Sequence, residues 1–175
     1  WSCVSLKLAE QIARRKAELP WIICAGERVT VREAAKSDWN GLIKWGPFKE
    51  WPDQAAFQAY IDGQYKFYEY GLWLIEEKKT GLLLGRAGVW NPDEETCRRL
   101  EAAGEESGEY LELGYEVFPP YQGKNFAKEA CQAIMAYADW ELECRLCVRI
   151  WPDNLSSLNL AEKMRFARFR ETAGG

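Results

Sequence analysis

Residues 122–127, with the sequence Gln-Gly-Lys-Asn-Phe-Ala, join a glycine-containing loop to the start of an apolar helical pattern. At the N-terminus of a helix, successive backbone N–H groups have no intrahelical partner and carry the positive end of the helix dipole. They can therefore bind an anion such as a pyrophosphate. Taken alone this signal is weak, because one glycine before a helix more often makes an ordinary turn.

Asn154 and Ser157 form a second polar pair, at the start of a later apolar pattern. Residues three apart place their side chains on one face of a helix. An isolated pair of this kind most often caps the helix, so the pattern leaves both a cap and a binding group open.

The chain contains no histidine. This excludes Ser–His–Asp and Cys–His catalytic groups, and histidine as a zinc ligand or general base. Cys144 and Cys147 form the single C-x-x-C among six scattered cysteines, and they lie on an expected strand where residues three apart point to opposite faces. We therefore expect no metal site, and we expect the reduced, mostly buried thiols of a cytoplasmic protein.

The length, composition and charge limit the number of domains and the classes of partner that this protein can bind. A length of 175 residues predicts one domain, which can bury a core without disulfides or metals. The net charge of −4 disfavours nucleic acid and anionic membrane surfaces, which attract basic proteins. No apolar run approaches the about 20 residues that span a bilayer. The sequence begins with Trp1 rather than Met, so its start says little about targeting.

Hydrophobic spacing and breaker residues predict the elements that must position these groups. Helices are expected over about residues 4–19, 39–45, 52–70 and 124–140, with one more after Asn154. Strands are expected over 28–33, 72–77, 82–90, 109–118 and 145–151, with a last strand that begins in 166–170. Residues 91–108 are acidic and lack a core pattern, so we interpret them as an inserted loop with room for one helical turn. The mixture of hairpins and βα units predicts an α+β fold whose mixed sheet has helices on both faces.

The order and spacing of these segments resemble the GNAT superfamily of N-acetyltransferases, and more narrowly its branch of ribosomal-protein N-terminal acetyltransferases. The resemblance covers residues 28–170 and implies a mixed, mostly antiparallel sheet flanked by helices, an α/β/α sandwich. Residues 1–26 would form an N-terminal helical extension, and residues 27–175 the acetyltransferase domain with its acidic inserted loop at about 91–108. The matching segments are the opening strand at 28–33, the central hairpin at 70–81 and 85–90, the acetyl-CoA loop at 122–127, and the late helix with Asn154, Ser157, Glu162 and Lys163.

The resemblance implies a role for each matching position. Val117 would offer its backbone to the pantetheine arm of acetyl-CoA, as the edge of a strand does. Asn154 would help to position the cofactor or the acceptor amine, and Ser157 would protonate the departing thiolate. Glu112 occupies a strand position where relatives often carry an acidic residue. The backbone amides expected to hold the pyrophosphate belong to Gln122, Gly123, Lys124, Asn125, Phe126 and Ala127.

Acetyl transfer to an amine explains why a carboxylate would be needed. An amine attacks a thioester only when it is neutral, and most amines are protonated at neutral pH. Glu112 could accept that proton directly or through water. Glu116 is the second candidate, because two even-numbered residues share one face of a strand. Backbone N–H groups near Val117 could stabilise the oxyanion. Both carboxylates could equally belong to a solvated strand face.

Three features depart from the family pattern. Asn125 stands where the acetyl-CoA loop usually has glycine, and asparagine tolerates positive φ better than other non-glycine residues. Arg165 stands at the expected C-terminal cap of the late helix, where left-handed geometry would cost about 1 kcal/mol. The family's usual final strand does not appear before Gly175, so either the sequence is trimmed or a partner, such as a second copy in a homodimer, supplies a strand.

We therefore expect an acetyl-CoA-dependent N-acetyltransferase that acts on a primary amine, either a protein N-terminus or a small molecule. The acidic residues within 93–112 could attract a basic acceptor. The departures at Asn125 and Arg165 favour an alternative, a non-catalytic GNAT-fold module that binds CoA or a protein partner. A third and weaker alternative is a scaffold that binds no cofactor.

Overall fold

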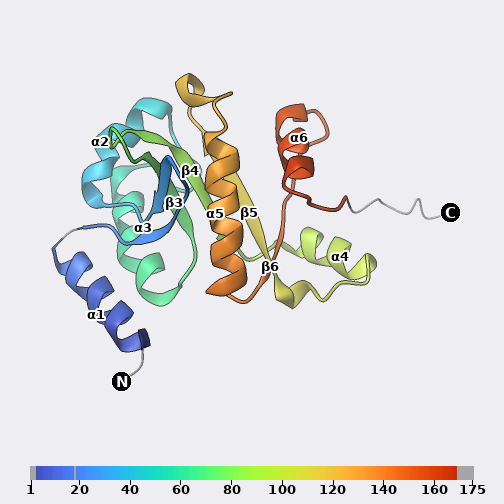
Figure 1. Ribbon diagram of the computed structural model, residues 1–175, viewed down its shortest axis with the longest axis horizontal. Coiled ribbons are helices and arrows are strands. Elements are labelled where there is room, and N and C mark those ends of the chain that lie inside the picture. The colour runs from blue at the N-terminus through green and yellow to red at the C-terminus, as the bar shows by residue number, and fades with distance from the viewer. Residues whose placement is uncertain (1–2, 18, 169–175) are drawn as a thin grey trace.

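The structure is a computed structural model that describes residues 3–17 and 19–168 (Figure 1). Its helices are α1 (Cys3–Lys16), α2 (Trp39–Leu42), α3 (Gln54–Phe67), α4 (Glu94–Ala102), α5 (Phe126–Trp140) and α6 (Leu155–Lys163). Its strands are β1 (Ile22–Ala25), β2 (Val29–Arg32), β3 (Leu72–Glu77), β4 (Leu83–Trp90), β5 (Tyr110–Val117) and β6 (Arg145–Cys147).

The strands form one sheet in the order β1-β2-β3-β4-β5-β6. Neighbouring strands are antiparallel except β5 and β6, which run parallel. A parallel pair needs a crossover connection, and α5 provides it (Figure 1). The predicted α+β fold, with a mixed and mostly antiparallel sheet flanked by helices, is therefore confirmed.

The two faces of the sheet are covered by different segments. On one face, α5 packs along the sheet, and its Tyr137 ring meets Trp73 of β3 edge to face at 5.8 Å. On the other face, the aromatic segment before α3 covers β4, where the Arg86 guanidinium lies 4.2 Å from the centroid of the Phe48 ring. Because side chains alternate along a strand, each position of β4 and β5 belongs to one of these two environments.

The structure differs from expectation in two segments. The helix of the N-terminal extension expected over residues 1–26 ends at Lys16, and Ile22–Ala25 form β1, the edge strand of the sheet, which was not expected. Its four residues are all apolar, so the sequence lacks the alternation that marks a half-buried strand, and its pairing with β2 contains a register shift between Ile22 and Cys24. Residues 91–108 are not a loop, because they contain the nine-residue helix α4.

Local chemistry explains α4. The Asp93 carboxylate accepts a hydrogen bond of 2.8 Å from the Thr96 backbone N–H and so caps the first turn. Leu100 is the buried residue of this helix, and one buried side chain does not produce a helical pattern in the sequence.

The C-terminal strands also differ from expectation. The strand expected over 145–151 ends at Cys147. Residues 166–168 are irregular rather than extended, and residues 169–170 lie outside the described part of the chain.

Candidate functional site

The sheet opens on one side of β5. The pairing with β6 joins Tyr110, Leu111 and Glu112 to residues 145–147 and goes no further. Beyond β6 the chain turns away from β5 toward α6 (Figure 1). Within the described residues, Leu113–Val117 therefore have a strand partner on the β4 side alone.

Hydrogen bonds show which backbone N–H and C=O groups of this segment face the open side. The Phe118 N–H donates to the Leu84 carbonyl at 2.8 Å, so the backbone groups of Phe118 face β4. Because backbone groups alternate sides along a strand, those of Val117 and Tyr115 face the open side. The Gln122 side-chain amide donates to the Val117 carbonyl at 2.8 Å and joins the strand to the loop that follows. The open side of β5 can thus accept an extended ligand as an added strand.

The loop 122–127 has the backbone geometry of an anion cradle. Gly123 has φ 73°, and Asn125 has φ 65° and ψ 12° in the left-handed region, directly before α5 begins at Phe126. Asn125 thus adopts the positive φ that asparagine tolerates better than other non-glycine residues. Its side chain makes no capping hydrogen bond, so the first N–H groups of α5 are not satisfied by Asn125. Amides turned by left-handed residues at a helix N-terminus favour an anion.

Asn154 and Ser157 lie on the other side of the opening, at the start of α6. The Asn154 Oδ1 atom accepts from the Ser157 N–H at 3.2 Å and from the Ser156 hydroxyl at 3.1 Å. Asn154 is therefore a helix cap, the ordinary interpretation of the pair. The cap also fixes the backbone that carries the Ser157 side chain.

At the far end of α6, Arg165 keeps the left-handed geometry of a C-terminal cap, with φ 66°. Its N–H donates to the Glu162 carbonyl at 2.9 Å, and the Phe166 N–H donates to the Ala161 carbonyl at 3.0 Å. This pair of bonds is the Schellman motif, which usually has glycine at the left-handed position.

Tyr115 of β5 is a polar group that the sequence analysis did not identify. It is the cross-strand partner of Ala87 on the α5 face, and its hydroxyl is buried without a hydrogen-bond partner among the described residues. Burial raises the pKa of the Tyr115 phenol, and the adjacent Ser157 hydroxyl acts in the opposite direction. Tyr115 and Ser157 are thus polar neighbours across the opening between β5 and α6.

Glu112 lies on the opposite face of β5 and is almost fully buried, with 5% of its surface exposed. Its Oε1 atom is 3.5 Å from Nε of Arg149, which also forms an ion pair with Asp93 at the start of α4. Its Oε2 atom has no hydrogen-bond partner among the described residues. Burial raises the pKa of Glu112, the Arg149 charge lowers it, and the Asp93 charge raises it further, with a net increase. A buried carboxylate with a raised pKa is suited to proton transfer.

Glu116 lies on the same face, as predicted, but its environment differs. Its carboxylate is exposed and pairs with Arg86 at 2.8 Å, and Arg86 also pairs with Glu50 at 2.6 Å. The Arg86 guanidinium thus engages the Glu116 carboxylate, whereas one carboxylate oxygen of Glu112 has no partner among the described residues.

Trp90 forms an aromatic wall beside Glu112, its cross-strand partner. The Trp90 ring covers Gly114, where a Cβ atom would lie 2.2 Å from Cη2 of the indole. Only glycine at position 114 leaves space for the ring in this position. Neither Trp90 nor Arg149 carries a sequence signal, because their roles depend on strand register and on a contact with α4.

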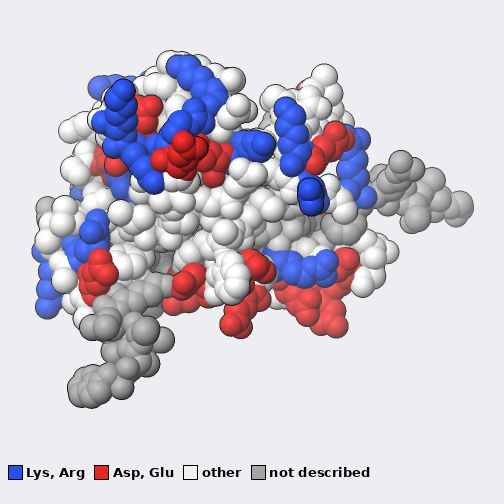
Figure 2. Space-filling view, in the orientation of Figure 1, with Lys and Arg blue, Asp and Glu red and all other residues white. Residues whose placement is uncertain are grey.

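Charge is distributed unevenly over the molecule. Figure 2 shows Lys and Arg gathered over the end that holds the N-terminus of α5 and α6, and Asp and Glu gathered along the opposite edge around α4. Lys124 before α5, and Lys163 and Arg165 at the end of α6, are exposed, as are Glu94, Glu95 and Glu101 of α4 and Glu106 after it.

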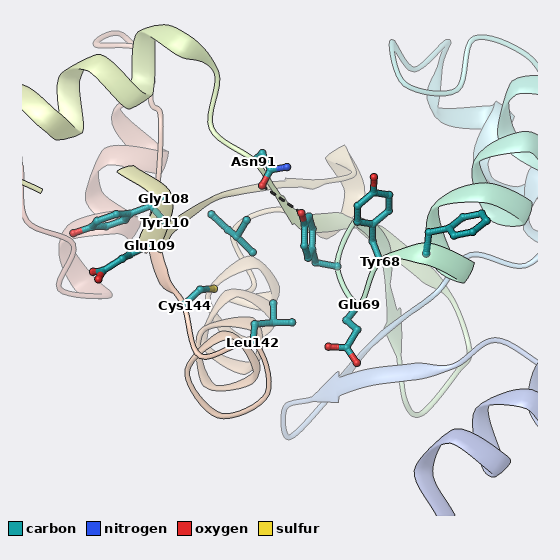
Figure 3. Close-up of a pocket in the computed structure, with 11 residues that line it drawn as sticks. Tyr68, Glu69, Asn91, Gly108, Glu109, Tyr110, Leu142 and Cys144 are labelled. Atoms are coloured by element: carbon teal, nitrogen blue, oxygen red, sulfur yellow. Dashed lines mark hydrogen bonds between the residues drawn. The ribbon is translucent and has the colours of Figure 1, made fainter. Parts of the chain in front are cut away.

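A separate cavity of about 400 Å³ lies near the start of β5 (Figure 3). Leu142 and Cys144 line it on one side, and the Tyr70 hydroxyl donates to Asn91 Oδ1 at 3.3 Å on the other. None of the predicted site residues lines this cavity.

Residues 3–17 and 19–168 lack two features. They contain no group of three or more Cys, Asp or Glu side chains placed to hold a metal ion. No helix in this part of the chain has the length and apolar character needed to cross a membrane.

The sequence matches the acetyltransferase (GNAT) domain family over residues 28–167. It is 30% identical over 100 residues to the uncharacterized protein YkkB of Bacillus subtilis, a match that covers 57% of this chain and 52% of that relative. The chain thus spans about half the length of the curated relative it matches.

Solved structures with a similar fold include two acetyltransferases. RimL, a ribosomal L7/L12 alpha-N-protein acetyltransferase, has a TM-score of 0.60 and 17% identity, and the match covers 84% of this chain and 81% of that one. Mutant forms of the spermidine/spermine N-acetyltransferase SpeG from Vibrio cholerae have a TM-score of 0.62 and 14% identity, with 80% of each chain covered.

Proposed function

The chain belongs to the GNAT acetyltransferase family, and from this premise we propose that it transfers an acetyl group from acetyl-CoA to a primary amine. One observation carries the proposal: the open side of β5 continues directly into the left-handed loop at the N-terminus of α5. An extended pantetheine arm can bond to the open side of β5 as an added strand, and a pyrophosphate can bond to the backbone amides of the loop.

On the donor side, Val117 presents its backbone to the pantetheine arm, and the amides of residues 122–127 bind the pyrophosphate. The Gln122 side chain holds the Val117 carbonyl and so keeps the strand and the loop in register. Asn154 acts indirectly, because its cap on α6 fixes the position of Ser157.

Acetyl-CoA supplies the activated acyl group, whose C–S bond breaks as the C–N bond to the amine forms. Glu112 accepts the proton that the amine nitrogen must lose, directly or through one water molecule. The Ser157 hydroxyl donates a proton to the departing sulfur, and Tyr115 beside it can return a proton to Ser157. No step in this scheme needs a metal.

The acceptor class follows from the surroundings of Glu112. The carboxylates of Asp93 and of α4 border this side of the molecule, so they favour an acceptor that carries positive charge. RimL and SpeG are named for a protein N-terminus and for polyamines respectively, and both are amines of this kind. We assign this chain a basic primary amine, either a protein N-terminus or a small molecule.

The thiols suit a reducing, cytoplasmic environment. Cys24, Cys97, Cys131, Cys144 and Cys147 are free. Burial raises the pKa of Cys24, Cys131 and Cys147 to about 12, which keeps these thiols protonated and unreactive.

The proposal is tested by thermal unfolding with and without acetyl-CoA, followed by thiol release with a panel of amines. A ligand at 100 times its dissociation constant adds about 2.7 kcal/mol to the free energy of unfolding. No shift at millimolar acetyl-CoA would overturn the proposal. Binding of acetyl-CoA without turnover on any amine would instead favour the non-catalytic module. That alternative was based on the departures at Asn125 and Arg165, and it is weakened because both residues keep left-handed geometry.

The role of Ser157 has its own test. Ser157→Ala keeps the backbone N–H that the Asn154 cap uses, so we expect an unchanged affinity for acetyl-CoA and a lower kcat. A collapse of affinity with no separate effect on kcat would make Ser157 a binding residue rather than a proton donor.

A further inference from the structure

Arg28, in the turn between β1 and β2, reaches the loop that precedes α5 although about a hundred residues separate them in the sequence. Its Nη2 atom donates to the Lys124 carbonyl at 3.1 Å. Its guanidinium also lies 4.6 Å from the centroid of the Phe126 ring. Arg28 therefore contacts the residues on both sides of the left-handed Asn125.

A second group fixes the Arg28 side chain. Glu129, in the first turn of α5, accepts from Arg28 Nε at 2.9 Å, from the Arg28 backbone N–H, and from the Val29 N–H at 3.0 Å. Burial alone would raise the pKa of Glu129, but these hydrogen bonds lower it and keep the carboxylate charged. Gly26 permits this approach, since a Cβ atom there would lie 2.5 Å from Cγ of Glu129.

The contact with Lys124 determines where one amide points. A peptide unit is planar and trans, so its C=O and N–H groups point in opposite directions. The C=O of Lys124 and the N–H of Asn125 belong to the same peptide unit. Because Arg28 holds this carbonyl on its own side, the Asn125 N–H points away from Arg28. A charged donor on the carbonyl also polarises the peptide and makes its N–H a better donor.

We propose that Arg28 is a positioning residue for acetyl-CoA, which aims the Asn125 N–H at the pyrophosphate by holding the Lys124 carbonyl. This inference rests on the proposed function. The charge of Arg28 is already paired with Glu129, so the residue acts through the geometry of its planar fork rather than as a free positive charge. Lysine cannot reproduce the fork or the contact over the Phe126 ring.

The test compares two acetyl donors, acetyl-CoA and S-acetyl-pantetheine, which lacks the pyrophosphate. In Arg28→Met and Arg28→Lys, we expect KM and the dissociation constant for acetyl-CoA to rise about tenfold, the effect of one lost charged hydrogen bond. The kcat and the KM for the amine should stay unchanged, and so should kcat/KM with S-acetyl-pantetheine. Arg98→Met, on the exposed surface of α4, is the matched control for loss of one positive charge.

The outcomes separate this inference from the proposed function. If wild type binds no acetyl-CoA, the proposed function fails first. If wild type binds acetyl-CoA and Arg28→Lys binds it equally well, Arg28 acts as a plain charge or not at all, and the inference is wrong. Equal losses with both donors would mean a general structural role and would also overturn it. If Arg28→Met does not fold, Arg28→Lys gives the same comparison. A further supporting result is that added ethylguanidinium restores the acetyl-CoA affinity of Arg28→Ala.

Discussion

The two ends of β5 lie beside different kinds of groups. At the loop end, the Val117 backbone, the left-handed Asn125 and the start of α5 present backbone amides, which Arg28 and Gln122 hold in place. At the carboxylate end, Glu112 lies beside Arg149 after β6, and Arg149 in turn pairs with Asp93 before α4.

This difference bears on what each end can do. Backbone groups depend on φ and ψ angles, so single substitutions change the loop end only where they change those angles. The carboxylate end consists of three side chains, so one substitution can change its charge and its pKa. Under the proposed function, the first arrangement suits the acetyl donor and the second suits a basic acceptor.

The largest expected effect is at the carboxylate end. Glu112→Gln keeps the shape of the side chain and removes the proton acceptor, so kcat/KM should fall by about 10²–10⁴-fold, the usual contribution of a general base. The loss should be greatest below the pKa of the amine, where the acceptor is protonated. Rates measured from about pH 6 to 9, with a saturating acetyl-CoA concentration, check this.

Glu116→Gln is the matched control for this change, since it alters the same residue type two positions along the same face. Its carboxylate is exposed and paired with Arg86, so we expect a small effect. If Glu116→Gln is the more damaging change, the assignment of the two carboxylates is reversed.

The next effect belongs to the loop end. Asn125→Ala places a Cβ-bearing residue without a local polar side chain in the left-handed region, at a cost of roughly 1–2 kcal/mol. Acetyl-CoA affinity should fall by about 5- to 30-fold if this cost appears in binding. Asn125→Gly should bind at least as well as wild type, because glycine adopts this geometry freely.

Calorimetric titration of acetyl-CoA into both variants measures the order, with melting curves as a control for folding. Equal affinity of the Ala and Gly variants would show that the left-handed geometry is not what binds the pyrophosphate.

The sequence predicts the loop end better than the carboxylate end, and the reason is physical. The loop motif is local, and the preference of asparagine for positive φ could be inferred from the residue type alone. The cap at Asn154 could likewise be inferred from its residue type, whereas the left-handed Arg165 could be expected only from its place at the C-terminal cap of the helix.

The groups that the sequence does not predict depend on contacts between distant segments. Arg149 reaches Glu112 only because β6 runs parallel to β5, and Asp93 joins them only because α4 exists. The fold class was predictable from hairpins and helix patterns, but β1 and α4 were not, because each buries too few side chains in a regular order.

A smaller effect is expected at Arg149. Its guanidinium lowers the pKa of Glu112, so Arg149→Met should raise that pKa further. The base must be deprotonated to act, and therefore the acidic limb of the kcat/KM profile should move to higher pH when the Arg149 charge is removed. Wild type and variant are compared with the same amine, so the titration of the acceptor cancels. A limb that stays in place or moves to lower pH would contradict the coupling between Arg149 and Glu112.

The smallest effect separates left-handed geometry that binds a ligand from left-handed geometry that only ends a helix. Arg165 has φ 66° like Asn125, but it lies in the Schellman motif of α6, and its side chain is exposed. Arg165→Gly relieves the left-handed strain but increases the freedom of the unfolded chain, so the net gain in the free energy of unfolding should be at most about 1 kcal/mol. For a chain of this length, that gain raises Tm by about 2–4 °C. Acetyl-CoA affinity should not change, in contrast to the response expected at Asn125. A change in affinity without a change in Tm would place Arg165 in the donor site and remove the distinction between the two left-handed residues.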